Sequence, residues 1–155
     1  MSLLSKLTII IPTFYPGKII IKCLKSLPKK SEIIIVDNGD DSELEKIIKL
    51  QKHKIKHYKV GDVGLSKSFN IALAKSKNEN ILITQPDVYF EKNSIINLVK
   101  AQKKYTKVGI IIVNLERDIK NLTIFVYFKN SNKCFLWYFN FSKLFTSSFS
   151  FFLLI

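Results

Sequence analysis

Residues 31–50, SEIIIVDNGDDSELEKIIKL, hold the pattern that decides the fold of this chain. The β-branched run IIIV at 33–36 predicts a buried strand. The polar run DNGDD that follows predicts a turn. Ser42 and Glu45 then form the S-x-x-E pattern of a capping box, which predicts that a helix begins here. The stretch is therefore one strand–turn–helix unit.

The same unit recurs along the chain between residues 6 and 113. Further strands are predicted at 6–12, 55–60, 79–85 and 107–113, and further helices at 16–28, 65–77 and 93–105. Alternation of strand and helix favours a sheet whose strands are mainly parallel, with helices packed on both faces. We therefore expect an α/β fold, a three-layer α/β/α sandwich.

The composition changes after Asp118. No acidic residue follows, and 9 of the 12 Phe lie in this last part. Residues 122–128 and 133–139 predict a β-hairpin with a polar turn. The end of the chain is aromatic and apolar, but polar residues interrupt it too often for a predicted membrane span. We expect one domain over 1–118. Residues 119–155 would add a hairpin and a tail that pack in the same domain or contact a membrane or partner.

The charge is strongly positive, with 25 Lys and Arg against 12 Asp and Glu and a net charge of +13. Such a surplus attracts polyanions, among them anionic membrane surfaces, phosphorylated ligands and nucleic acid, although it also serves plain solubility. The lysines are scattered and no nucleic-acid-binding motif is present, which argues against nucleic acid.

Cysteine usage indicates the compartment. Cys23 and Cys134 lie far apart and no C-x-x-C occurs, which argues against a disulfide framework and for buried thiols. The N-terminus also lacks the pattern of a signal peptide. We expect a reduced, cytoplasmic setting, with the chain peripheral to the membrane if it meets one.

The ends of the first four predicted strands lead into short segments that together contain carboxylates, amides and glycines. These segments are residues 12–15, 37–41, 61–64 and 85–87. In open α/β sheets, ligands bind beyond the carboxyl ends of the strands. The carboxylates, amides and glycines of these segments therefore predict one ligand site at that edge.

Four stretches carry a resemblance to a known family. They are LTIIIPTFY at 7–15, EIIIVDNGDDSE at 32–43, GDVGLSKSFNIALAKS at 61–76 and NILITQPDVYF at 80–90. In order and spacing they resemble the nucleotide-sugar-binding half of family 2 glycosyltransferases, which have the GT-A fold. The resemblance implies transfer of a hexose from a nucleoside-diphosphate sugar, metal-assisted and with inversion. The alternative is a truncated or degenerate module that binds a nucleotide sugar without catalysis.

The resemblance also implies roles for single residues. Pro12 and Thr13 match the turn against the nucleobase, and Asp37 matches the acid that contacts the base or ribose. Asp62-Val63-Gly64 matches an Asn-x-Gly segment, with Asp in place of Asn. The implied nucleotide-sugar-binding residues are Pro12, Thr13, Tyr15, Asp37, Asn38, Gly64, Asn70 and Gln85. A further departure is the Asp40-Asp41 pair, which stands where the family usually has Ser-Thr-Asp.

Gln85-Pro86-Asp87 stands where many family members have Asp-x-Asp, and some have Asn-Pro-Asp. Loss of a nucleoside diphosphate leaves negative charge that a divalent cation can stabilise. Mg²⁺ and Mn²⁺ prefer oxygen ligands and need few from the protein when phosphates supply others. Asp87 is therefore the predicted metal ligand, presented by a turn that Pro86 stiffens. The alternative is a solvated turn residue.

A carboxylate base for the acceptor hydroxyl is harder to assign. Glu116 and Asp118 are the candidates, but neither lies in a context similar to the base motif of the family. A partner subunit, including a second copy of the chain, could complete the site. The acceptor is expected to be a glycan, a lipid-linked molecule or a protein.

Overall fold

The structure is a computed structural model, and it describes residues 3–78, 80–104, 110–113 and 125–129. The strands are β1 (Leu7–Thr13), β2 (Glu32–Asp37), β3 (Ile55–Lys59), β4 (Asn80–Ile83), β5 (Ile110–Val113) and β6 (Phe125–Lys129). The helices are the 3₁₀ helix η1 (Leu3–Lys6) and the α-helices α1 (Ile19–Ser26), α2 (Ser42–Lys49), α3 (Leu65–Lys75) and α4 (Ser94–Lys104). In the described ranges, none of the helices is long and apolar enough to cross a membrane.

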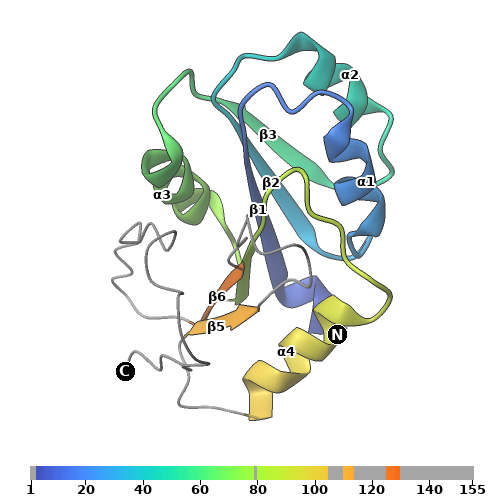
Figure 1. The fold of residues 1–155 in the computed structure, drawn as a ribbon. Helices are drawn as coiled ribbons and strands as arrows, with labels where there is room; N and C mark the ends of the chain where they lie inside the picture. Colours follow the sequence, from blue (N-terminus) through green and yellow to red (C-terminus); the bar gives the residue numbers. More distant parts are fainter. Residues whose placement is uncertain (1–2, 79, 105–109, 114–124, 130–155) are drawn as a thin grey trace, which may run out of the picture.

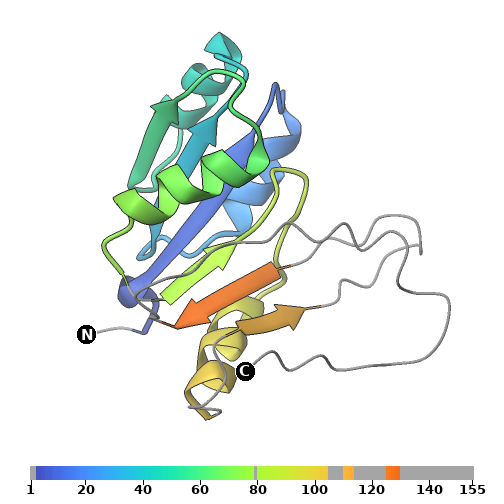
Figure 2. The ribbon, with the colours of Figure 1, turned by 90° about the vertical axis from the view of Figure 1, so that its left-hand side faces the viewer.

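One sheet organises the chain, with strand order β3-β2-β1-β4-β6-β5 (Figure 1). Strands β3, β2, β1 and β4 run parallel to one another, whereas β6 is antiparallel to both β4 and β5. Helices α1 and α2 cover one face of the parallel part and α3 covers the other (Figure 2). The predicted α/β sandwich with a mainly parallel sheet is confirmed.

The positions of the last two strands in the sheet differ from the order that simple alternation of strands and helices along the chain suggests. Residues 110–113 form the predicted fifth strand, but β6 separates it from β4. Both edges of β6 are therefore paired, and the predicted hairpin partner at 133–139 lies outside the described residues. Sequence periodicity predicts that a segment is a strand, but it does not predict which distant strand becomes its neighbour.

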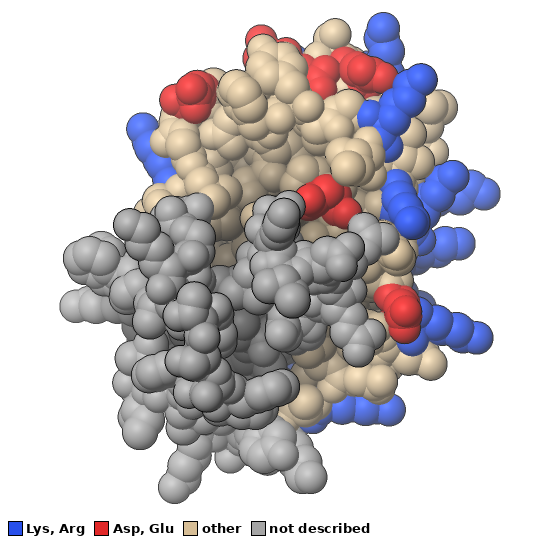
Figure 3. Space-filling model, viewed as in Figure 1, with Lys and Arg blue, Asp and Glu red and all other residues tan. Residues whose placement is uncertain are grey.

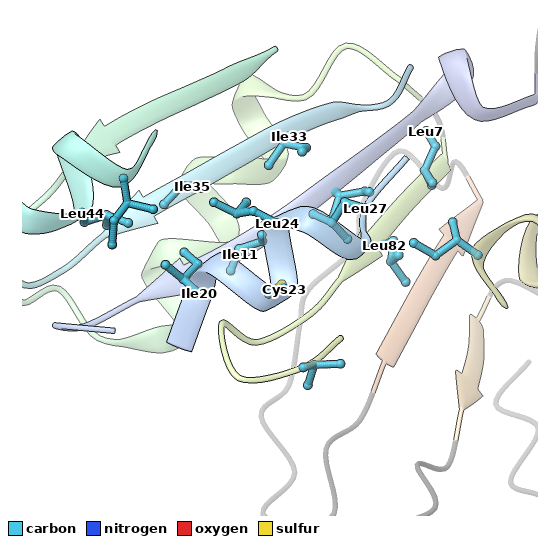
Figure 4. Close-up of a cluster of buried hydrophobic side chains, with 14 of the residues drawn as sticks. Leu7, Ile11, Ile20, Cys23, Leu24, Leu27, Ile33, Ile35, Leu44 and Leu82 are labelled. Carbon is cyan, nitrogen blue, oxygen red and sulfur yellow. The ribbon is translucent and has the colours of Figure 1, made fainter. Parts of the chain in front are cut away.

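Alternate residues of the strands build two cores, one on each face of the sheet. Ile11, Ile33 and Ile35 point toward α1 and α2, where they pack against Leu24, Leu44 and other buried side chains (Figure 4). Ile9 belongs to the same cluster. Ile10, Ile34 and Val36 point the other way, against Phe69 and Ala72 of α3. Burial on both faces explains why β1, β2 and β4 are largely apolar, whereas the edge strand β3 is only partly buried and carries polar residues.

Helix α2 begins one residue earlier than the capping-box pattern predicts, because that pattern makes Ser42 the N-cap. The N-cap is Asp41, whose carboxylate accepts a hydrogen bond from the Glu43 backbone N–H at 2.8 Å, and Ser42 is the first helical residue. Asp41 itself is held by its backbone N–H, which donates to Asp37 Oδ2 at 3.0 Å. Both Asp and Ser are good caps, so this tertiary contact decides between them.

Gly39 is required in the turn after β2, because a side chain there would strike Tyr15. A Cβ would lie 2.8 Å from the Tyr15 ring and 3.0 Å from its backbone nitrogen. We expect Gly39→Ala to destabilise the fold by about 2 kcal/mol, as overpacking does. Gly61→Ala is the control. Its Cβ would meet nothing within 4 Å, so the only source of destabilisation is the strain of an alanine at a φ of +67°. Thermal unfolding of both variants checks this, and an unchanged Gly39→Ala midpoint would contradict it.

Candidate functional site

The carboxyl ends of β1, β2 and β4 meet at one edge of the sheet and border a cleft of about 260 Å³. It is lined by Pro12, Thr13, Phe14, Asn38, Asp62, Gly64, Leu65, Gln85 and Pro86. A larger hollow of about 390 Å³ lies between the end of α1 and the start of α4. We place the candidate site in the smaller cleft, because the strand ends and the predicted polar residues converge there.

Asn38, directly after β2, forms hydrogen bonds to β1 and to α3 beside the cleft. Its backbone N–H and its side-chain amide both donate to the Thr13 carbonyl, at 2.9 and 3.2 Å. Its Oδ1 lies 2.8 Å from the hydroxyl of the buried Ser68 on α3. The same hydroxyl lies 2.8 Å from the Gly64 carbonyl, so one proton is shared between two acceptors. These contacts fix the position of β1 and β2 relative to α3.

Gly64 places the beginning of α3 at the cleft. It is the N-cap residue and has a φ of +77°, a conformation that favours glycine. Gly64 and Leu65 both line the cleft. The first N–H groups of a helix have no partners within the helix and attract negative charge, so this end of α3 suits a phosphate group.

Asp37 holds the turn beneath the cleft. Its side chain is fully buried, and it accepts hydrogen bonds from the backbone N–H groups of Gly39 and Asp41, each at 3.0 Å. The Thr13 hydroxyl donates to it at 3.4 Å, and His57 Nε2 lies 3.5 Å away. The carboxylate therefore satisfies the backbone of the DNGDD turn, a role that the sequence did not reveal.

Helix α1 supports the loop that follows β4. The Cys23 thiol donates to the Gln85 carbonyl at 3.6 Å, and the Ser26 hydroxyl accepts from the Phe90 backbone N–H at 3.0 Å. Burial, and then the negative charge of Asp87, raises the pKa of the Cys23 thiol to about 12. Cys23 is thus a buried thiol, as predicted, and Cys134 lies outside the described residues.

The cleft brings together some of the predicted nucleotide-sugar-binding residues and leaves others aside. Pro12, Thr13, Asn38, Gly64 and Gln85 line it. Tyr15, Asp37, Asn70 and Asp87 do not line it; Asn70 is exposed on α3, and Asp87 is exposed next to Pro86. Glu116 and Asp118 lie outside the described residues.

Four lining residues were missed as site residues: Phe14, Asp62, Leu65 and Pro86. Phe14, Leu65 and Pro86 are direct sequence neighbours of predicted site residues, and Asp62 is part of a segment that matches the family. Their closeness in sequence to predicted site residues could therefore have identified them. Phe14 is 61% exposed, and its ring makes an edge-to-face contact with Tyr15 at 5.0 Å between centroids. A large aromatic face at the cleft is therefore available to a planar ligand.

The acids around the cleft differ in what they contact. Lys59 pairs with Asp40 at 2.7 Å and also with Glu45, and hydrogen bonds to these two acids raise the pKa of the Lys59 amine. Asp41 caps α2. By contrast, no hydrogen bond or ion pair to a described residue is found for the exposed carboxylates of Asp62 and Asp87.

Asp62 and Asp87 carry exposed carboxylates near the cleft, of the type that could bind a divalent cation. Carboxylate oxygens are the ligands that Mg²⁺ and Mn²⁺ prefer. Within the described ranges, no group of three or more His, Cys, Asp or Glu side chains could hold a metal ion. A cation bound here would therefore take most of its ligands from the phosphates of a substrate or from water.

A mainly parallel sheet with a cleft at the carboxyl ends of its strands defines the class of open α/β domains, which bind their ligands at this edge. The sequence profile described as Glycosyl transferase family 2 matches residues 8–151. The chain therefore belongs to glycosyltransferase family 2, and its fold is GT-A-like. Among curated proteins, no sequence match was found.

Solved structures share this fold at low sequence identity. TarS of S. aureus, in a complex with UDP-GlcNAc, is 22% identical with a TM-score of 0.62; the match covers 75% of this chain and 37% of that one. The mannosyltransferase PcManGT of Pyrobaculum calidifontis, with GDP-Man and Mn²⁺, is 22% identical with a TM-score of 0.63, and the match covers 72% and 36%. A 4-diphosphocytidyl-2C-methyl-D-erythritol synthase is 12% identical with a TM-score of 0.59, and the match covers 80% and 75%. This chain thus spans well under half the length of the two glycosyltransferases.

Proposed function

We propose that this cleft binds a nucleoside-diphosphate sugar and that the chain transfers the sugar, with inversion, to an acceptor. The observation that carries the proposal is the convergence of Phe14, Gly64 and Asp62 on one cleft in a chain of glycosyltransferase family 2. The nucleotide sugars in the structures of TarS and PcManGT support this substrate class.

The cleft offers a distinct surface for each part of such a donor. The nucleobase lies against the exposed ring of Phe14 and beside Pro12. The diphosphate lies by the Gly64 end of α3, where backbone N–H groups attract negative charge. Asn38 and Asp37 act indirectly, because they keep the turn and α3 in place.

Asp87, with Asp62 as a second carboxylate, would hold Mg²⁺ or Mn²⁺. When bound, the cation supplies positive charge that stabilises the leaving diphosphate. The base that takes the proton from the acceptor hydroxyl is assigned to none of the described residues. The acceptor itself is proposed to be a glycan, a lipid-linked molecule or a protein.

Phe14→Ala should weaken donor binding, because it removes the aromatic surface for the base. Stacking of a base on an aromatic side chain is worth about 1–3 kcal/mol, so the dissociation constant should rise by about 5-fold to 150-fold. Calorimetric titration with UDP and GDP measures it. Leu50→Ala is the matched control, because Leu50 is 82% exposed at the end of α2 and does not line the cleft. Equal affinities of both variants and wild type would exclude Phe14 from the base site.

Transfer is tested by incubating the full chain with nucleoside-diphosphate sugars and Mn²⁺ and measuring release of the free nucleoside diphosphate. Slow donor hydrolysis without an acceptor, accelerated by a glycan or lipid-linked acceptor, is the expected result. Donor binding with no release under any condition would favour the alternative, a module that binds nucleotide sugars without catalysis. Absence of binding would overturn the proposal altogether.

A further inference from the structure

Helix α1 carries a row of lysines on its exposed side. Lys18, Lys22 and Lys25 are spaced four and three residues apart, so they lie on one face of the helix, and all three are exposed. Ile19 lies beside them and is 54% exposed, although it is a large apolar residue at the first position of the helix. We define these four residues as the α1 lysine face.

The positive charge of this face is not balanced by its own segment. Residues 14–31 contain no Asp or Glu, and Lys29 and Lys30 extend the positive charge beyond the end of α1. Figure 3 shows Lys and Arg side chains gathered along the edge of the molecule where α1 lies. The loop after β4, which contacts α1, carries Asp87 and Glu91, and among the described residues no ion pair joins either acid to the lysines of α1.

The chemistry of this face fits an anionic lipid surface better than nucleic acid. All of its charges are lysines, which act as point charges, whereas base recognition relies strongly on the planar arginine fork. Lys22 Nζ lies 3.7 Å from the centroid of the Tyr89 ring, so this ring already has a cation on its face. An exposed Ile19 among lysines instead suits the boundary between headgroups and acyl chains.

We propose that the α1 lysine face binds this chain peripherally to an anionic bilayer. Lysine head groups near such a surface attract it electrostatically, and Ile19 adds apolar area that enters the interface. Because only residues 14–18 separate β1 from α1, and Phe14 among them lines the cleft, binding through this face holds the strand-end cleft near the membrane. The inference requires no catalytic activity and can hold even where the proposed function fails.

Cosedimentation of the full chain with vesicles tests the proposal. The probes are phosphatidylcholine vesicles and vesicles of equimolar phosphatidylcholine and phosphatidylglycerol, at low and at high salt. The variant Lys18→Gln/Lys22→Gln/Lys25→Gln should lower partitioning onto the anionic vesicles on the order of a hundredfold, since each lysine is worth roughly fivefold there. Wild type should bind the neutral vesicles far more weakly, and high salt should weaken anionic binding.

A matched control distinguishes the effect of the α1 lysine face from the effect of total positive charge. Lys52→Gln/Lys75→Gln/Lys77→Gln removes the same charge from exposed lysines outside α1 and should retain most of the binding. Ile19→Gln should reduce the binding that persists at high salt.

Equal losses in both triple variants would overturn the proposal, as would wild-type partitioning of the α1 variant. Tighter binding of the chain to a DNA or RNA oligonucleotide, lost in the α1 variant, would reassign the face to nucleic acid. Thermal unfolding of each variant verifies that it is folded.

Discussion

Asp87→Ala should abolish the metal dependence of donor binding and lower the transfer rate on the order of a hundredfold or more. Asp87 follows the cleft residues Gln85 and Pro86, is exposed, and makes no hydrogen bond or ion pair with described residues. Its loss therefore leaves the fold intact but removes an oxygen ligand for the cation. Stabilisation of a leaving diphosphate by a cation is worth several kcal/mol, which sets the size of the effect.

Titration of a nucleoside diphosphate with and without Mn²⁺ measures the binding part of this prediction, and release of the diphosphate from a sugar donor measures the rate. Glu91→Ala is the matched control, because Glu91 is an exposed acid a few residues further along the same loop and lines the other hollow. Mn²⁺-enhanced binding that survives in Asp87→Ala would remove Asp87 as a ligand and direct attention to Asp62.

Asp37→Ala should destabilise the fold by about 3 kcal/mol, the largest loss expected from any single acid in the described chain. The buried carboxylate accepts two backbone hydrogen bonds at 3.0 Å, from Gly39 and Asp41. A hydrogen bond to a charged group contributes about 1.5–3 kcal/mol, and an unsatisfied buried N–H is costly in itself. The turn and the cap of α2 would loosen together, because Asp41 is that cap.

Two variants bracket this effect in chemical or thermal unfolding. Asp37→Asn retains one acceptor oxygen and should lose roughly half as much stability. Asp62→Ala removes an exposed acid and should change the free energy of unfolding by less than about 0.5 kcal/mol. If Asp37→Ala were as stable as wild type while donor binding was lost, Asp37 would be a ligand contact and not an anchor.

The fold was largely predictable because a short stretch of sequence indicates each strand and helix. The isoleucine runs of β1 and β2 indicate strands inside the sheet, where both faces are buried. The polar turns that join these strands to the helices come within a few residues of them in the sequence. The cleft was predictable in outline for the same reason, since parallel strands place their carboxyl ends together. The start of α2 was misplaced by one residue, because Asp41 and Ser42 are equally good caps.

What the sequence did not determine depends on partners distant along the chain. Residues 37 and 87 are both aspartates after apolar strands, yet Asp37 is sealed beneath the turn by backbone N–H groups and Asp87 is exposed beside the cleft. Similarly, helical spacing alone places the lysines of α1 on one face, but the packing of Ile20, Cys23 and Leu24 in the core decides that the lysine face is exposed. The insertion of β6 between β4 and β5 likewise follows from long-range pairing. Local patterns fix which segments become strands and helices, because burial and backbone preferences act on neighbouring residues. Only tertiary packing decides which polar groups the chain satisfies itself and which it leaves for a ligand.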